Sequence, residues 1–115
     1  MTAEQLAALL SSRRIPLTTE QAAQVAIEGV LSEEDITFKR EQSLGAAGRI
    51  DFMVGRIGIE VKIAHVSRAR QIHRQVARYC RAPELDGLVL ATGRSVALPV
   101  YDKPVVVLAL GRAWL

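Results

Sequence analysis

The stretch GRIDFMVGRIGIEVKI, residues 48–63, predicts two β-strands joined by a tight turn. Ile50, Phe52 and Val54 alternate with other residues before the turn, and apolar residues recur at every second position after it. This period of two is typical of strands with one apolar face. A two-residue turn at Gly55-Arg56, with Gly supplying the positive φ of a type II′ turn, pairs Val54 with the residue after Arg56. Continuing that register sets Asp51 directly opposite Glu60.

The facing carboxylates of Asp51 and Glu60 would repel one another, because Cβ atoms of opposite residues in an antiparallel pair lie about 4.5–5.5 Å apart. A compensating positive charge is therefore expected. Lys62, on the same face as Glu60, offers one, and a divalent cation between the carboxylates would offer a stronger one. Mg²⁺ suits such a site, because it prefers oxygen ligands, needs only one or two protein carboxylates and keeps water molecules that phosphate oxygens can replace. The pattern indicates a site for phosphodiester hydrolysis.

An Asp followed on the next strand by Glu-x-Lys resembles the motif of the PD-(D/E)XK nuclease superfamily. In this chain the motif reads Asp51, then Glu60-Val61-Lys62, and Ile50 stands where the superfamily usually has Pro. The predicted hairpin, its flanking helices and a later Gln75-x-x-x-Tyr79 resemble the RecB-like, VRR-NUC and Holliday-junction resolvase branches. The resemblance covers roughly residues 18 to 92.

The resemblance implies an α/β fold with a restriction-endonuclease-like core, in which a mixed sheet with a central β-hairpin is flanked by helices in the order αβββαβ. It also implies a Mg²⁺-dependent endonuclease, with Mn²⁺ as a substitute, that cuts branched or structured DNA such as a Holliday junction or a flap during repair or recombination. Asp51, Glu60 and the Val61 carbonyl would bind the metal. Lys62 would position or deprotonate the attacking water. The alternative is a non-catalytic nucleic-acid-binding or regulatory subunit with the same fold, since so short a chain has little surface for gripping a substrate.

A further carboxylate is expected near this hairpin. A capping box at Thr18 predicts a helix to about residue 31, and a projection of 100° per residue places Glu20 on its apolar side. Glu20 either interacts with the helix N-terminus or reaches the hairpin as an outer ligand of metal or water, as the first-helix Glu does in relatives. Glu28 is the second choice. Glu41 either lines the site or is solvated.

The next helix, predicted from an N-cap at Ser67 to residue 80 or 81, carries much of the positive charge. Residues 61–81 contain six Lys or Arg and no acidic residue. Either this is an ordinary solvated face, or it contacts nucleic acid. On the second interpretation Gln75 would orient Lys62 or a phosphate oxygen. The predicted nucleic-acid contacts are Arg49, Arg68, Gln71, Arg78 and Tyr79.

Length and composition predict one domain over residues 1–115, with a helical arm at 1–14 and a core at 18–110. The arm has a capping box at Thr2, and its role is either packing or an interface. Further strands are expected at 36–44, 88–91 and 104–110. The net charge of +3 permits nucleic-acid binding. A single cysteine, Cys80, fits a reducing cytoplasm, and neither a membrane span nor an export signal is expected.

The apolar residues near both ends predict a partner. Leu6, Leu9 and Leu10, together with residues 105–115, supply more apolar surface than one thin core obviously needs. A homodimer is expected, as in the small resolvases of the superfamily, or a larger complex. The alternative is that these ends complete the core of the monomer.

Overall fold

The computed structural model describes residues 1–63, 68–93 and 96–110, and it shows an α/β domain with a mixed five-stranded sheet. The strands lie in the order β1-β2-β3-β4-β5, with β1 to β3 antiparallel and β3 to β5 parallel. The elements are α1 (Ala3–Ser11), α2 (Glu20–Glu33), β1 (Lys39–Ser43), the 3-10 helix η1 (Gly45–Ala47), β2 (Arg49–Val54), β3 (Ile57–Lys62), α3 (Ala69–Cys80), β4 (Gly87–Thr92) and β5 (Val105–Ala109). This sequence of elements contains the predicted order αβββαβ, followed by one more strand.

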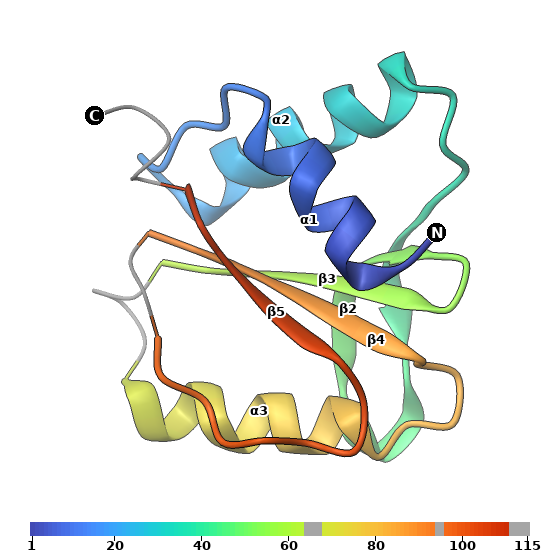
Figure 1. The fold of residues 1–115 in the computed structure, drawn as a ribbon, viewed down its shortest axis with the longest axis vertical. Coiled ribbons are helices and arrows are strands. Elements are labelled where there is room, and N and C mark those ends of the chain that lie inside the picture. Colours follow the sequence, from blue (N-terminus) through green and yellow to red (C-terminus); the bar gives the residue numbers. More distant parts are fainter. Residues whose placement is uncertain (64–67, 94–95, 111–115) are drawn as a thin grey trace.

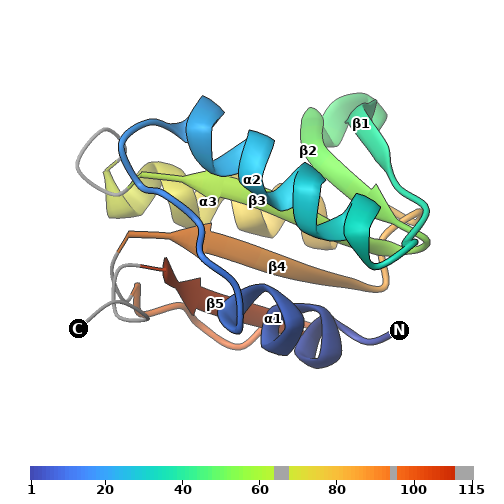
Figure 2. The same cartoon turned by 90° about the horizontal axis from the view of Figure 1, so that it is seen from above.

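Helices cover both faces of the sheet. Helices α1 and α2 lie on one face and α3 lies on the other (Figure 1). Seen from above, α2 follows β3, whereas α1 lies along β4 and β5 (Figure 2). The connection from β3 to the parallel β4 is a crossover, as the order of the elements predicts. Its helix, α3, covers the face of the sheet opposite α1 and α2 (Figure 1).

Two apolar clusters hold these layers together. The cluster between the sheet and the helices α1 and α2 includes Leu6, Leu10, Ile27, Leu31, Phe52, Val54, Ile59 and Val61. The cluster between the sheet and α3 includes Ile50, Met53, Ile72, Val76, Tyr79, Leu85, Leu88 and Leu90. Ala69, the first residue of α3, is exposed.

Helix α1 belongs to the core. Its capping box is present as predicted, with the Gln5 N–H donating to the Thr2 hydroxyl. Leu6 and Leu10 are completely buried against the sheet, so the role observed for the predicted arm is packing. The N-terminal leucines thus complete the monomer's own core. Trp114 and Leu115, on which the expectation of a homodimer also rested, lie outside the described residues.

Two helix starts differ from the predicted ones. Helix α2 is capped by Thr19, whose hydroxyl accepts from the Ala22 N–H at 3.0 Å, and the expected cap at Thr18 is wrong by one residue. This shift makes Glu20 the first residue of the helix. Ser67 lies outside the described residues, and α3 begins at Ala69. The first strand begins at Lys39, three residues later than expected. No helix in the described part of the chain is long and apolar enough to cross a membrane.

Candidate active site

Strands β2 and β3 part from each other at the predicted site. Gly55 has a φ of 58°, and the register runs as predicted from Val54 opposite Ile57 to Phe52 opposite Ile59. Beyond that pair, side chains replace the backbone ladder. The Asp51 N–H donates to Glu60 Oε1 at 3.2 Å, and the Val61 N–H donates to Asp51 Oδ2 at 2.8 Å. We call this divergence the fork and define it by Asp51, Glu60 and Val61.

An interruption in the neighbouring strand accompanies the fork. Arg40 pairs with Phe52 and Gln42 pairs with Ile50, but the residues between them, Glu41 and Asp51, are not paired. Glu41 has a φ of 52°, which a non-glycine residue rarely adopts.

The interruption also changes which faces the side chains of β2 occupy. Two residues that are two positions apart in a regular strand share a face, but Ile50 packs in the α3 cluster and Phe52 packs in the opposite cluster. The predicted single apolar face of Ile50, Phe52 and Val54 is therefore wrong at Ile50. The reason is that the strand is irregular at Asp51, which is paired with no residue of β1 or β3.

Lys62 and Glu20 reach the same region from the end of β3 and the start of α2. Lys62 Nζ lies 3.5 Å from Glu60 Oε2. Glu20 Oε2 accepts from the Ile63 N–H at 3.1 Å, directly after Lys62. Of the two helix carboxylates considered, Glu20 thus lies at the hairpin, whereas Glu28 forms an ion pair with Arg40 at 3.2 Å. The position of Glu20 in the first turn of α2 brings it there.

Arg40 is a residue of this region whose role the sequence did not reveal. Its Nε donates to the Asp51 carbonyl at 3.3 Å, and its Nη2 donates to Gln24 of α2 at 2.9 Å. The guanidinium lies 4.5 Å from the centre of the Phe52 ring. Arg40 therefore ties the interrupted strands to α2. These contacts join segments that are far apart in the chain, so no local sequence pattern predicts them.

On the other face, Tyr79 and Gln75 form a chain of hydrogen bonds to β2. Gln75 Nε2 donates to the Tyr79 hydroxyl at 2.9 Å, which donates to the Arg49 carbonyl at 2.8 Å. Gln75 thus bonds to Tyr79, although it was expected to orient Lys62 or a phosphate oxygen. Tyr79 is completely buried, so its predicted contact with nucleic acid is wrong, because its ring packs in the core. The side chains of Arg49, Arg68, Gln71 and Arg78 are exposed, as direct contacts would require.

Burial raises the pKa of both carboxyl groups of the fork, and the positive charge of Lys62 offsets this effect only in part. Burial, and then the charge of Asp51, raise the pKa of Glu60 to about 8. Burial also raises the pKa of Asp51, against the lowering effect of the Val61 N–H bond. Burial and the nearby Glu60 raise the pKa of the Tyr79 hydroxyl. Both shifts raise the pKa, so the charged form of each carboxyl group is disfavoured at the fork, and a bound cation would counteract this effect.

The donor set of the fork fits Mg²⁺ better than a metal that needs a complete protein cage. Within the described residues no three His, Cys, Asp or Glu side chains are grouped as a metal site. Zn²⁺ normally takes at least three protein ligands. Mg²⁺ is usually held by one or two carboxylates and completes its shell with water and substrate oxygens. Asp51 and Glu60 would be those two carboxylates.

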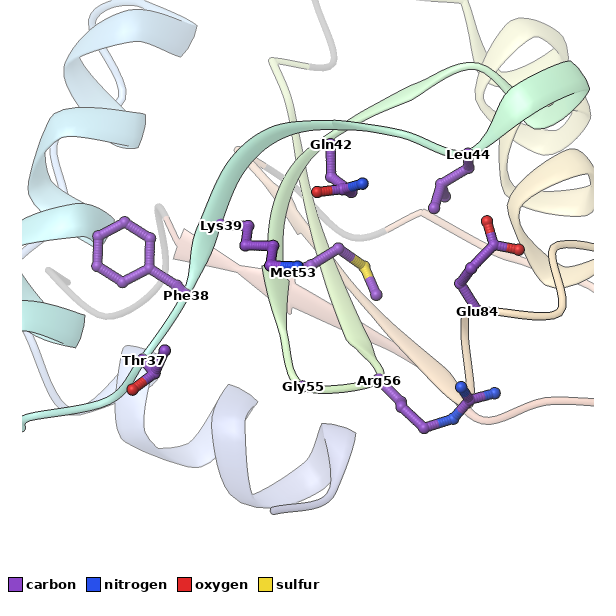
Figure 3. A pocket seen from close by; sticks show the side chains of 9 residues that line it. All are labelled: Thr37, Phe38, Lys39, Gln42, Leu44, Met53, Gly55, Arg56 and Glu84. Carbon is purple, nitrogen blue, oxygen red and sulfur yellow. The ribbon is translucent and has the colours of Figure 1, made fainter.

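A large pocket lies away from these carboxylates (Figure 3). It has a volume of about 410 Å³ and is formed by the start of β1, the turn between β2 and β3, and Glu84. Its lining residues are Thr37, Phe38, Lys39, Gln42, Leu44, Met53, Gly55, Arg56 and Glu84. None of them belongs to the fork.

Comparison of the chain with protein-family models, with curated proteins and with solved structures found no match.

Proposed function

We propose that this chain is a Mg²⁺-dependent endonuclease of the PD-(D/E)XK type that hydrolyses phosphodiester bonds in branched or structured DNA. The observation that carries the proposal is the fork, where Asp51 and Glu60 approach each other with Lys62 beside them. Glu20 adds a carboxylate from α2 at the same end of β3. The sheet and helices around it support a restriction-endonuclease-like core.

The carboxylates of Asp51 and Glu60 would hold Mg²⁺, or Mn²⁺ in its place, together with the Val61 carbonyl. The N–H and C=O groups of one strand residue point to the same side, and the Val61 N–H points to Asp51, so its carbonyl is expected to face the fork as well. A bound Mg²⁺ would supply Lewis-acid polarisation of the phosphate and lower the pKa of a water molecule.

The other side chains have roles that follow from their positions. The Lys62 ammonium is largely buried beside Glu60, where it can stabilise negative charge that develops on phosphate oxygens and orient the attacking water. Glu20, bonded to the Ile63 N–H, is placed to hold a second water molecule. Tyr79 and Gln75 hold the Arg49 end of β2 against α3 and so position Asp51 indirectly.

Exposed arginines would hold the DNA. Arg49, Arg68 and Arg78 lie on or next to the elements that form the fork, and their charges suit phosphate groups. A homodimer would present two such sites to the two sides of a junction, and it remains part of the proposal.

The test compares cleavage by three variants on junction, flap, duplex and single-stranded DNA with Mg²⁺ or Mn²⁺. Asp51→Asn and Lys62→Ala are expected to lower the cleavage rate at least about 100-fold, the loss seen when one transition-state contact is removed. Lys39→Ala is the matched control, because it removes an exposed lysine from the same sheet. Circular dichroism of each variant checks the fold.

Calorimetric titration with Mg²⁺ separates the proposal from a non-catalytic module. We expect binding at millimolar Mg²⁺, and its loss in Asp51→Asn. Undiminished cutting by either site variant contradicts the mechanism. A chain that binds DNA, cuts none of the substrates and binds no metal is the regulatory or binding subunit instead.

A further inference from the structure

A second pocket, of about 360 Å³, lies where η1 meets the C-terminal turn of α3. Its lining residues are Leu44, Ala46, Ala47, Arg78, Arg81, Ala82 and Pro83. Small and apolar side chains make most of its surface, and the guanidinium groups of two arginines supply its charge. The volume falls within the range of sites that hold small organic ligands.

The positive charge of this pocket favours an anionic ligand. Arg78 and Arg81 are exposed, and the described residues give neither guanidinium an ion-pair partner. Among the described residues, no acidic side chain lines the pocket. A guanidinium binds phosphate oxygens in a bidentate manner, and its flat face also stacks on nucleobases.

The apolar part of the pocket fits a flat ring. Leu44 and Ala82 are buried beneath it, while Ala46 and Ala47 present only methyl groups. Methyl and methylene groups bury the face of a base, and a neighbouring guanidinium plane can stack on it, without selecting its sequence. A nucleotide therefore matches both halves of the pocket. Its base fits the apolar half, and its phosphate fits the two arginines.

Two hydrogen bonds link segments that form the walls of the pocket to β2, the strand that carries Asp51. Arg78 is followed by Tyr79, whose hydroxyl donates to the carbonyl of Arg49, two residues before Asp51. On the other side, the Leu44 N–H donates to the Gly48 carbonyl at 2.7 Å and joins the pocket wall to the start of β2. The pocket walls are thus bonded to the start of β2, and we infer that a DNA strand with a phosphate at the fork places a neighbouring nucleotide at the pocket.

We propose that this pocket is a nucleotide subsite that binds a nucleotide of the cleaved strand close to the bond that is cut. As a site for the cleaved strand it rests on the proposed nuclease function, but its affinity for a nucleotide does not. Efficient cleavage therefore requires that the substrate has nucleotides on the side of the cut that faces the subsite.

The first test measures the pocket without cleavage. The full ¹⁵N-labelled chain is titrated in EDTA with deoxyadenosine monophosphate, and separately with inorganic phosphate, up to about 10 mM. We expect saturable amide shifts at Ala46, Ala47 and Ala82 with the nucleotide, and weaker affinity for phosphate alone. Arg81→Ala should weaken nucleotide binding at least fivefold. Arg74→Ala, which removes the same charge from an exposed position of α3 outside the pocket, should change it less than twofold.

A charge-neutral variant tests the apolar half. Ala46→Leu fills the pocket and is expected to raise the KM for DNA roughly 10-fold, because the base is excluded from the pocket, with kcat little changed. Absence of nucleotide shifts at the pocket overturns the subsite whatever the cleavage assay shows. Equal affinity for phosphate and nucleotide overturns its base-binding half. Nucleotide binding in a chain that cuts no DNA leaves the subsite standing and removes the nuclease.

Discussion

At the scale of single residues, the fork holds a carboxyl group in an environment that disfavours its charge. Glu60 is only 4 % exposed and faces a second acid, and Lys62 does not fully compensate. The folded protein therefore keeps a proton that the unfolded chain releases near the ordinary pKa of 4.5. Such a site is suited to a cation, because a cation that replaces the proton compensates the charge of the carboxylate.

This proton makes stability depend on pH. Because the folded pKa of Glu60 is raised to about 8, its contribution is fully present below about pH 4.5 and is lost as pH rises to 8. The free energy of unfolding should fall across this window by up to about 1.4 kcal/mol per pH unit from this group. Urea unfolding at pH 5, 6.5 and 8 without metal measures it.

Glu60→Gln should flatten this slope, because the amide oxygen still accepts from Asp51 and carries no charge. Part of the slope should remain, because the pKa of Asp51 is raised as well. Glu4→Gln, in the exposed first turn of α1, is the control and should keep the wild-type slope. A slope in Glu60→Gln equal to that of wild type would show that Glu60 is ionised in the folded protein.

At the scale of elements, the hairpin is regular at its turn and irregular at its open end. The regular end is packed closely. A Cβ atom added at Gly58 of β3 would lie 2.3 Å from Ile50 Cδ1 and 2.8 Å from Leu85 Cδ1. Both neighbours are completely buried, so they have little room to move. Gly58 thus lets the α3 cluster close over the centre of the sheet.

Gly58→Ala is expected to destabilise the protein by about 1–3 kcal/mol, the usual cost of overpacking. Adding Ile50→Val, which removes the closest methyl group, should recover part of that loss, so the two changes should not be additive. Denaturant unfolding of the single and double variants measures the coupling. Gly29→Ala is the control, because nothing lies within 4 Å of its added Cβ and α2 should gain up to about 1 kcal/mol. Additive effects of the two core changes would show that the strand relieves the clash elsewhere.

At the scale of the whole molecule, α1 closes one side of the sheet. It lies along β4 and β5, so the apolar N-terminal residues have a place within the monomer. The large apolar side chains exposed in the described part of the chain are Met1, Val25 and Val100. The prediction of a homodimer therefore no longer follows from the N-terminal leucines. Light scattering tests it, with 12.6 kDa as the mass of one chain.

Leu10→Ala should cost about 2–5 kcal/mol, because it leaves a cavity under a completely buried side chain. Val25→Ala, on an exposed position of α2, should change stability by less than about 0.5 kcal/mol. Thermal and denaturant unfolding compare the two at several protein concentrations. A small effect of Leu10→Ala would mean that α1 is an arm that leaves the sheet in solution.

The sequence by itself determined the hairpin, its turn, the order of helices and strands and the proximity of Asp51 to Glu60. These features follow from local rules, since a period of two, a glycine in a turn and a Thr-x-x-Gln cap act over a few residues. The sequence determined the position of Glu20 only in part. The helix face on which Glu20 lies could be projected from the sequence, but its distance to β3 could not. Its place at the Ile63 N–H was open until the packing of α2 was known.

Only the tertiary structure decided how the hairpin opens. The interruption at Glu41 and Asp51, the contacts of Arg40 with α2 and the burial of Tyr79 depend on segments separated by 10 to 30 residues. The alternation of apolar residues predicted the wrong face for Ile50, because a period of two residues does not indicate where the pairing of strands stops. The pocket at Arg78 and Arg81 was hidden for the same reason, since its walls come from η1 and α3 and meet only in the folded chain.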